Sequence, residues 1–275
     1  MIPEYKKMSK VVFITGISSG FGKYTSSFLA QKGYKVYGTC RKACEHDPLV
    51  NLLQMDVTDL SAVEKSIRLV LEKEGRIDVL INNAGTHTGG AIEVLPYEDI
   101  RLQMETNFMG AVYAIRTVLP AMRKQGKGTV INISSLGGLM GLPFQGYYSA
   151  SKFAIEGFSE ALRMELKEFN INVLVINPGD FHTKNTINRR NVFKSESDNA
   201  YETQFTKTLS IIENDEYNGW KPEILARKLY KILEKERPAN RYIIASFEQK
   251  LALVLKRILP GSLFEAILRG HYGIR

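Results

Sequence analysis

The sequence predicts an α/β protein of one domain, in which a doubly wound parallel sheet carries helices on both faces. Apolar runs such as VVFIT at 11–15 are typical of strands that are buried on both sides. Such runs alternate along the chain with longer helical patterns, which is the order of consecutive β–α–β units. The 275 residues contain no internal repeat or linker, and their number suits a single domain over 1–275.

The strands and helices follow one another in a regular order. Strands are expected at 11–15, 35–40, 51–55, 76–82, 128–134, 171–177 and 241–247. Helices are expected from the turn after the first strand to Gly33, from the start signal of Asp59 and Ser61 to Gly75, over 100–124, from Tyr148 to Asn170, and from Pro222 to Arg237. Pro178-Gly179 stops the sixth strand, and residues 180–220 show a loop and a polar helix but no strand.

Composition excludes several classes of protein. Hydrophobic residues make up 44% and charged residues 24% of the chain, as is typical of a globular protein. Cys40 and Cys44 are its only cysteines and its four histidines are scattered, so neither a disulfide framework nor a metal site is predicted. The N-terminal MIPEYKKMSK lacks the apolar run of a signal peptide, and no stretch is long enough to span a bilayer. A cytoplasmic location is therefore expected.

The net charge of +8 is spread along the chain. A basic protein can attract nucleic acid, anionic membranes or phosphorylated ligands. Because no nucleic-acid motif accompanies the Lys and Arg residues, the expected reading is a solvated basic surface with no nucleic-acid partner.

A glycine-rich turn, TGISSGFG at 15–22, joins the first strand to the first helix. Its glycines are Gly16, Gly20 and Gly22, so its spacing differs from that of the common G-x-G-x-x-G fingerprint. Glycines at such a junction allow a tight turn and let a pyrophosphate approach the N–H groups of a helix N-terminus. A plain structural turn is the alternative, but the position after the first strand favours a dinucleotide site.

Seven elements of the chain, in this order, form a recognisable set. They are TGISSGFG, Asp56-Val57, NNAG at 82–85, Asn107, Ser134-Ser135, YYSASK at 147–152 and PGDFHT at 178–183. Over residues 11–183 the chain therefore resembles the short-chain dehydrogenase/reductase family. The resemblance implies a Rossmann-type fold, hydride exchange between a nicotinamide cofactor and a carbonyl or alcohol, and a homodimer or homotetramer.

The resemblance also implies the catalytic residues. Tyr148 would exchange a proton with the substrate oxygen, and Ser135, rather than its neighbour Ser134, would hydrogen-bond that oxygen. A phenol titrates near pH ~10, and an ammonium one helical turn away, on Lys152, is expected to lower that pKa. Asn107 would anchor a water chain to Lys152, although a satisfied polar residue inside a helix is a rival interpretation.

By the same resemblance, the cofactor site combines the glycine-rich turn with residues at the ends of four later segments. Its expected members are Gly16, Ser18, Ser19, Gly20, Phe21, Gly22, Asp56, Val57, Asn83, Ala84, Gly85, Tyr148, Lys152, Pro178, Gly179 and Thr183. Asp180 and His182 depart from the apolar or small residues that are commoner in this last motif, which leaves the loop conformation open.

The end of the second strand indicates which cofactor is bound. NAD-binding folds usually carry an acidic residue there, but Cys40 occupies that position and is followed by Arg41 and Lys42. Without a carboxylate to repel a 2′-phosphate, and with two cations and Ser18 available to bind it, NADP(H) is predicted over NAD(H). A solvated, charged loop tip is the alternative.

Residues 247–275 form an amphipathic, basic extension that Pro260-Gly261 divides into two helices. One apolar face carries Leu251, Val254, Leu255 and Ile258, and Ser262 to Glu265 read as a capping box for the second helix. The surrounding cations are Lys250, Lys256, Arg257 and Arg269. The helices are expected either to pack on the domain or a subunit neighbour, or to make peripheral contact with an anionic membrane.

The expected function is that of an NADPH-dependent carbonyl reductase, reversible as an alcohol dehydrogenase, acting on an apolar ketone. The aromatic-rich lid segment 180–220 is expected to close over the substrate, and Met140, Leu142 and Phe144 make the entrance apolar. Steroid- or retinol-dehydrogenase-like and ketolipid-reductase-like members of the family offer the nearest analogies. Two alternatives remain: a non-catalytic NADP(H)-binding redox sensor, and a reductase of 3-oxoacyl or small polar carbonyl substrates.

Overall fold

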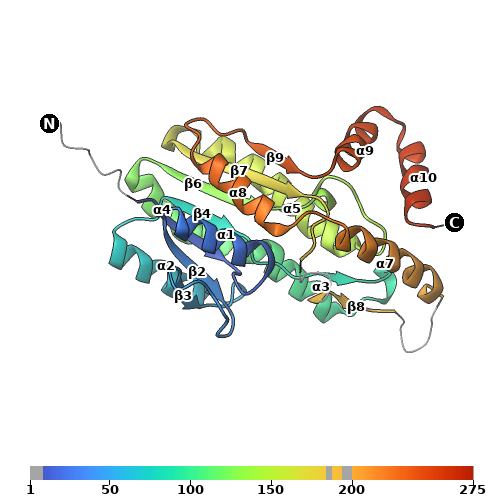
Figure 1. The fold of residues 1–275 in the computed structure, drawn as a ribbon, viewed down its shortest axis with the longest axis horizontal. Coiled ribbons are helices and arrows are strands. Elements are labelled where there is room, and N and C mark those ends of the chain that lie inside the picture. Colours follow the sequence, from blue (N-terminus) through green and yellow to red (C-terminus); the bar gives the residue numbers. More distant parts are fainter. Residues whose placement is uncertain (1–8, 184–187, 194–199, 275) are drawn as a thin grey trace.

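The computed structural model describes residues 9–183, 188–193 and 200–274. Seven strands form one sheet in the order β3-β2-β1-β4-β6-β7-β9, and every neighbouring pair is parallel (Figure 1). Their bounds are β1 (Val11–Thr15), β2 (Lys35–Cys40), β3 (Asn51–Gln54), β4 (Val79–Asn82), β6 (Gly128–Ile133), β7 (Ile171–Pro178) and β9 (Arg241–Ile244). The predicted doubly wound sheet is confirmed, and its order reverses between β1 and β4, where α/β folds hold their ligands.

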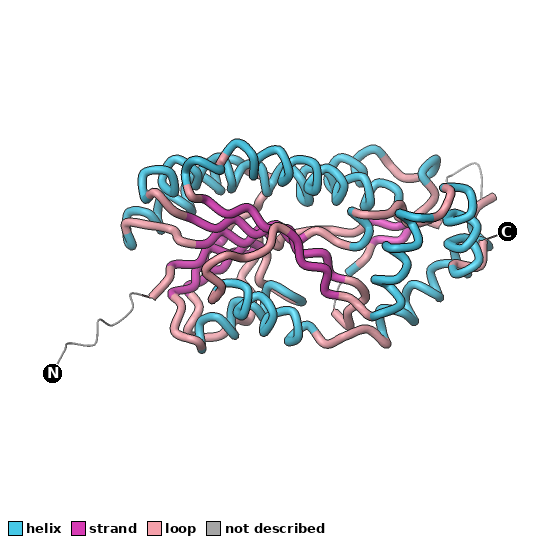
Figure 2. Tube along the Cα trace, turned by 90° about the horizontal axis from the view of Figure 1, so that it is seen from above, coloured by secondary structure: helices cyan, strands magenta, loops and turns pink. Residues whose placement is uncertain are grey.

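Helices cover both faces of the sheet (Figure 2). They are α1 (Gly20–Gln31), α2 (Leu60–Glu74), α3 (Tyr97–Met104), α4 (Gly110–Gln125), α5 (Gly146–Glu165), α7 (Glu202–Tyr217), α8 (Pro222–Leu233), α9 (Phe247–Ile258) and α10 (Gly261–His271). Successive residues of a strand point to opposite faces, so Val11 and Phe13 pack in the core under α2 and α4, whereas Val12 and Ile14 pack in the core under α1 and α8. The two cores explain why strands such as β1 are apolar throughout.

Local signals set several of the element boundaries. Gly33 and Gly75 have φ values of 85° and 72°, which glycine adopts readily, and they end α1 and α2 as predicted. Pro222 is the first residue of α8, where its missing N–H costs nothing. Asp59 caps α2 by accepting a hydrogen bond from the N–H of Ala62, at the expected start of this helix.

Three expectations about secondary structure are wrong. The helix expected over 100–124 is two helices, α3 and α4, joined by a π-helical turn over Glu105–Met109. In the segment expected to hold no strand, Arg190–Asn191 forms β8, which pairs with β5 (Thr88–Gly89). This pairing spans about a hundred residues and has no local signal, whereas π-turns of this kind are often found at functional sites.

The third error concerns the capping box expected at Ser262. Helix α10 starts one residue earlier, at Gly261, and Pro260 precedes it without a side-chain cap. A capping box does occur, but it is Ser246 with Gln249 and it starts α9. Helix α9 follows the end of β9, and α10 lies farther out, beside the C-terminus (Figure 1). Leu253, Leu255, Leu259 and Leu268 of these helices pack on a third core cluster made of Leu136, Met140, Ala245 and Phe264.

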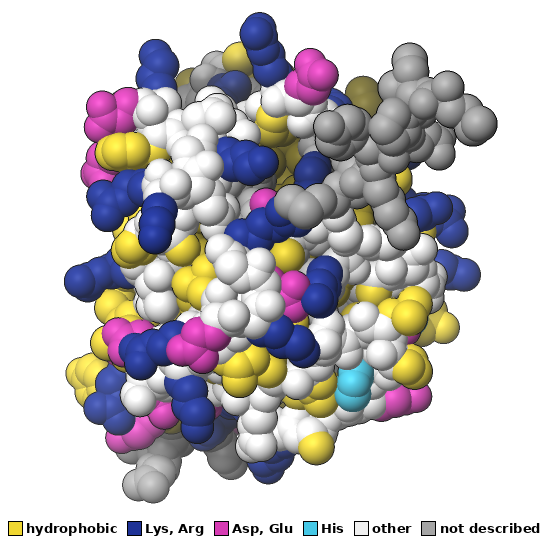
Figure 3. Space-filling view, turned by 90° about the vertical axis from the view of Figure 1, so that its left-hand side faces the viewer, with side chains coloured by type: hydrophobic (Ala, Val, Ile, Leu, Met, Phe, Trp, Pro, Cys, Tyr) yellow, Lys and Arg dark blue, Asp and Glu magenta, His cyan; other side chains and the backbone are white. Residues whose placement is uncertain are grey.

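Basic side chains are spread over the molecule. On the face drawn in Figure 3, Lys and Arg lie among acidic and hydrophobic side chains instead of forming one patch.

No helix within the described ranges is long and apolar enough to cross a membrane. The same part of the chain contains no group of His, Cys, Asp and Glu residues that would hold a metal ion.

Candidate active site

A cleft of about 1110 Å³ opens at the carboxyl ends of the central strands and extends to α9 and α10. It collects most of the residues that the sequence predicts for the site. Those along its walls are Gly16, Ser18, Ser19, Gly20, Phe21, Arg41, Asp56, Val57, Asn83, Ala84, Gly85, Ser135, Tyr148, Lys152, Pro178, Gly179 and Thr183. Gly22, Lys42 and Asn107 lie outside the lining, and the roles expected of them stay predictions.

The glycine-rich turn forms one end of the cleft. Gly16 and Gly20 have φ values of 73° and 52°, and a Cβ added to Gly16 would lie 2.7 Å from the Cα of Ala84. Gly22 is needed for packing, because its Cβ would lie 2.1 Å from the carbonyl oxygen of Gly16. The Asn83 amide donates to that same oxygen at 2.8 Å, which joins the two predicted motifs.

The N-terminus of α1 faces this end of the cleft. Ser19 is its N-cap, but no side chain of the described residues caps the helix there. The free N–H groups and the helix dipole therefore suit a diphosphate. Thr183 lies opposite, since a Cβ on Gly20 would come within 3.7 Å of its side chain. These features fit a dinucleotide cofactor.

The end of β2 carries the residues predicted to select the cofactor. Arg41 follows the strand directly, is exposed and borders the cleft, whereas the neighbouring Lys42 is exposed but lies outside the lining. Asp56 follows β3 and borders the same region, with Oδ1 accepting hydrogen bonds from the N–H and hydroxyl of Thr58 at 2.9 and 2.8 Å. Asp56 thus closes its own turn, while Asp59 caps α2.

Tyr148 and Lys152 lie in the middle of the cleft on α5. The Lys152 Nζ donates to the carbonyl oxygen of Ile133 at 3.0 Å and lies 5.8 Å from the centre of the Tyr148 ring. Burial lowers the pKa of Lys152 to about 8, while the charge of Glu156 opposes that shift. The one-turn spacing therefore produces the predicted proximity.

The expected effect of Lys152 on Tyr148 is not what the structure shows. Burial raises the pKa of the Tyr148 phenol, and the hydrogen bond with Ser135 is the largest opposing influence. The expectation considered only the neighbouring cation, whereas Lys152 is buried and Tyr148 half-buried, and burial drives each group toward its neutral form.

Ser135 is better placed than Ser134 for the predicted role. Ser135 is half-buried, lies close enough to Tyr148 to lower the pKa of its phenol, and accepts from the N–H of Gly137 at 3.1 Å. Ser134 is buried, and its hydroxyl has no partner among the described residues. The contact with Tyr148 favours Ser135, as the spacing predicts.

Asn107 sits in the π-turn between α3 and α4 and is buried. Its Oδ1 accepts from the N–H of Thr86 at 2.7 Å, and its Nδ2 donates to the carbonyl oxygen of Thr86 and to Ser151, both at 3.0 Å. These bonds support the rival interpretation, in which Asn107 is a satisfied polar residue. The π-turn thereby positions the loop after β4, and the predicted water chain stays a prediction.

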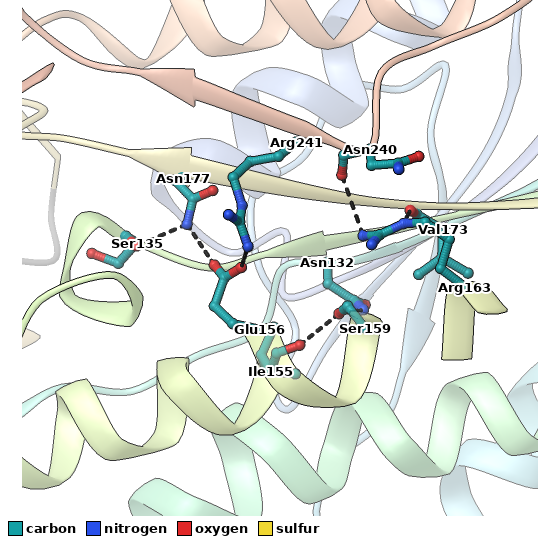
Figure 4. Close-up of polar contacts among 10 residues, drawn as sticks. All are labelled: Asn132, Ser135, Ile155, Glu156, Ser159, Arg163, Val173, Asn177, Asn240 and Arg241. Carbon is teal, nitrogen blue, oxygen red and sulfur yellow. Dashed lines mark hydrogen bonds and ion pairs between the residues drawn. The ribbon is translucent and has the colours of Figure 1, made fainter. Parts of the chain in front are cut away.

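A polar network behind the cleft connects Ser135 to α5 (Figure 4). The Asn177 amide on β7 donates to the carbonyl oxygen of Ser135 at 3.0 Å and to the carboxylate of Glu156. Glu156 pairs in turn with Arg241 on β9 at 2.7 Å. The network fixes the backbone of Ser135 relative to the helix that carries Tyr148. It joins four separate parts of the sequence, so no local pattern reveals it.

His87 is the main site residue that the sequence analysis missed. Its ring stacks on that of Tyr148, with 4.1 Å between the ring centres and 21° between the planes. Arg189 donates to its Nδ1 at 3.3 Å and pairs with Glu216. Burial, with the charges of Arg189 and Lys152, holds the pKa of His87 well below its usual value, so the ring is neutral. Its place two residues after NNAG was the signal that could have revealed it.

The other end of the cleft is apolar with an acidic border. Leu136, Met140, Leu142, Leu251, Leu255, Phe264, Ile267 and Leu268 supply the apolar walls. Phe144, expected at the entrance, instead packs on Phe205 of α7 with 5.2 Å between ring centres and lies outside the lining. Asp180, Asp215 and Glu216 form the acidic border, and burial together with the other two carboxylates raises the pKa of Asp180 to about 6.

The low pKa of Lys152 makes stability depend on pH. Between about pH 8 and 10 the unfolded chain keeps the proton that folded Lys152 has released, so the free energy of unfolding rises with pH. Below pH 8 the buried cation costs on the order of 3 kcal/mol. Lys152→Met should therefore stabilise the cofactor-free protein at pH 7, and by less at pH 10. Urea unfolding of the native protein and of the variant at both pH values measures the change in the free energy of unfolding. Lys124→Met, at an exposed position, is the control. An equal change at pH 7 and pH 10 would contradict the prediction.

Comparisons with known proteins bear on the whole chain. The family model described as short chain dehydrogenase matches residues 10–192. A 3-ketodihydrosphingosine reductase of Bacteroides thetaiotaomicron is 44% identical over 97% of this chain and 99% of its own. An NADPH-dependent 3-dehydrocapnine reductase of Ornithobacterium rhinotracheale is 30% identical, covering 90% and 93%. A crystal structure of a short-chain dehydrogenase from Streptomyces avermitilis has a TM-score of 0.81 and 31% identity, covering 95% and 98%.

Sequence motifs, sheet order and cleft agree with these similarities along almost the entire chain. The family resemblance that the motifs suggest is thus confirmed. The chain belongs to the short-chain dehydrogenase/reductase family.

Proposed function

We propose that this oxidoreductase is an NADPH-dependent carbonyl reductase acting on a long-chain ketone. The observation that carries the proposal is that Tyr148, Ser135 and Lys152 lie close together in one cleft. The glycine-rich turn, which suits a dinucleotide, forms one end of this cleft, and apolar side chains form the other. The cofactor supplies the hydride when it is bound. The Tyr148 hydroxyl gives its proton to the carbonyl oxygen, and the Ser135 hydroxyl holds that oxygen in place.

Burial prepares these side chains for reduction. A phenol whose pKa is raised stays protonated at neutral pH, which is the form needed to protonate a ketone. The phenolate that remains after transfer is stabilised by Lys152 in its cationic form, 5.8 Å from the ring centre. Stacking on neutral His87 restricts the orientation of the Tyr148 ring without placing a second charge beside it.

The choice of NADPH rests on the end of β2. Arg41 borders the cleft beside the turn that receives the diphosphate, and a guanidinium can grip a phosphate with two parallel hydrogen bonds. Exposed Ser18 in the turn offers a further donor. The relative named as NADPH-dependent supports the same choice.

The substrate end favours a lipid that also carries an amine. Its apolar walls fit an alkyl chain. In the acidic border Glu216 pairs with Arg189 and Asp215 with His271, so Asp180 is the carboxylate that would receive a cation near the carbonyl. A 3-ketodihydrosphingosine combines both features, and a relative named for reducing it covers almost this entire chain. The lid segment 180–220 supplies these carboxylates, which supports its proposed role over the substrate.

A matched set of ketones tests the substrate. We expect kcat/KM for 3-ketodihydrosphingosine to be about tenfold or more higher than for a ketone of the same chain length that lacks the amino group. One additional interaction of roughly 1.4 kcal/mol is enough for a tenfold difference. A steroid ketone, a 3-oxoacyl thioester and a small polar ketone should be poorer still. NADPH oxidation, followed by its fluorescence, is the readout. Equal rates with and without the amino group would refute recognition of an amine, and a preference for the small ketone would refute the lipid substrate.

Peripheral contact with an anionic membrane is the proposal for the outer face of α9 and α10. Leu251, Val254 and Ile258 are 44%, 51% and 68% exposed, although Leu255 of the same predicted face packs inward. Phe247, at 80%, extends this apolar surface, and Lys250 and Arg257 are exposed beside it. Leu251 also borders the cleft, so the surface is continuous with the substrate end.

Liposome sedimentation tests this contact without disturbing the third core cluster. We expect the protein to pellet with anionic vesicles, and the surface variant Val254→Ser/Ile258→Ser to pellet several-fold less. Leu69→Ser, at an exposed residue of α2, is the matched control and should pellet like the native protein. Equal pelleting of all three proteins would exclude the membrane surface. Light scattering then decides whether a second subunit covers these helices in the proposed dimer or tetramer.

A further inference from the structure

The two cysteines of the chain lie together beside the cofactor end of the cleft. Cys40 ends β2 and borders the cleft, and Cys44 follows in the connection to β3. Their Sγ atoms are 2.7 Å apart, well inside the ~3.5–4.0 Å optimum for non-bonded heavy atoms and approaching the ~2.05 Å of a disulfide bond. No step of the proposed reaction uses either thiol.

The two sulfur atoms differ in their surroundings. Cys40 is 5% exposed, and its thiol donates to the carbonyl oxygen of Lys42 at 2.8 Å. Burial raises the pKa of Cys40 to about 12, so it stays a thiol until a partner reacts with it. Cys44 is half-buried and more accessible than Cys40. Cys44 is therefore the sulfur that a small oxidant reaches first.

We propose that Cys40 and Cys44 are a redox modification site, where peroxide produces a reversible disulfide that weakens NADPH binding. The proposal rests on the NADP(H) preference assigned to Arg41. It differs from the reductase chemistry because the reacting atoms are the two sulfurs at the cofactor end of the cleft.

The reaction balances with one peroxide molecule. The Cys44 thiolate attacks a peroxide oxygen, the O–O bond breaks, and the departing hydroxide takes up a proton to leave as water. Cys40 sulfur then attacks the sulfenic sulfur of Cys44, and the hydroxyl group leaves as a second water with the Cys40 proton. The two thiols lose two electrons in total, and the peroxide gains them. A dithiol reverses the step by thiol–disulfide exchange.

The new bond would act on Arg41 through the backbone. It removes the thiol proton that holds the carbonyl oxygen of Lys42, and it closes a ring across Arg41, Lys42 and Ala43. The Arg41 carbonyl oxygen is itself held by the Gln54 amide at 3.1 Å. Because this short turn positions the guanidinium, a change in its dihedral angles moves the predicted phosphate contact.

Binding measurements on the full chain test the proposal. The reduced protein and Cys44→Ser should bind NADPH alike, because Cys44 does not border the cleft. Peroxide should remove both free thiols of the native protein, lower its mass by two hydrogens, and raise the Kd for NADPH about tenfold, the effect of losing one charged contact. Dithiothreitol should restore the affinity. The Kd for NADH, which lacks the 2′-phosphate, should change less, and Cys44→Ser should not respond.

Two results would overturn the proposal. One is free thiols that persist under peroxide while the protein stays folded, and the other is a disulfide, confirmed by mass, that leaves the Kd for NADPH unchanged. If the assigned NADPH preference itself is wrong, the reduced protein already shows equal Kd values for NADPH and NADH, before any peroxide is added. That result is distinct from both outcomes above. Thiol counting and mass do not depend on that preference.

Discussion

Replacing Tyr148 by phenylalanine should lower kcat by about a thousandfold or more, the scale of a lost general acid. The affinity for NADPH should hardly change, since the ring and its stacking on His87 are kept. Single-turnover and steady-state rates with the ketolipid, together with NADPH fluorescence titration, measure the two quantities. The proton donor is removed, while the shape of the cleft is preserved.

Tyr147 provides a matched control in the same turn of α5. Its hydroxyl reaches the carbonyl oxygen of Ile92 at 3.5 Å and does not border the cleft, so Tyr147→Phe should keep near-native turnover. If Tyr148→Phe also kept its turnover, Tyr148 would not be the proton donor. A native protein that bound NADPH but reduced no ketone would instead favour the alternative of a non-catalytic redox sensor.

Replacing Arg41 by aspartate should reverse the preference for the cofactor. The ratio of kcat/KM with NADPH to that with NADH should fall by about a hundredfold or more, because a charged hydrogen-bond donor of about 1.5–3 kcal/mol is lost and a repelling carboxylate appears. The new carboxylate can also accept a hydrogen bond from the ribose 2′-hydroxyl of NADH, which should raise the activity with that cofactor. Initial rates with both cofactors at several concentrations give the ratio.

Lys42 offers the comparison that separates a specific contact from general electrostatics. Lys42→Asp changes the charge equally, but Lys42 lies outside the cleft lining, so its effect on the ratio should be much smaller than that of Arg41→Asp. Equal effects of the two variants would show that only the overall charge of the loop matters. A native protein that prefers NADH would refute the assignment of Arg41 altogether.

Patterns of short range in the sequence predicted most of the fold. Every residue of β1 is buried because both faces of the sheet are covered, and this produces the unbroken apolar run that identifies the strand. Gly75 and Pro222 end and start helices by their own dihedral preferences. Features that need a distant partner escaped prediction, as β8 shows, because Arg190 pairs with Thr88 about a hundred residues earlier.

The same distinction applies to the site. The glycine-rich turn and the spacing of Tyr148 and Lys152 are local, and the chain alone indicated both. The contact of His87 with Tyr148 and Arg189, and that of Asn177 with Ser135 and Glu156, depend on how separate elements pack. Such contacts leave no periodic trace in the residues on either side.

The sequence by itself determined the sheet, the cofactor-binding end and the pair on α5, because each follows from residues within one turn or strand. Only the tertiary structure decided the charge state of that pair. Burial removes water from both side chains, which raises the pKa of Tyr148 and lowers that of Lys152 to about 8. The amount of water around a group depends on every element that covers it, and that information is spread over the whole chain.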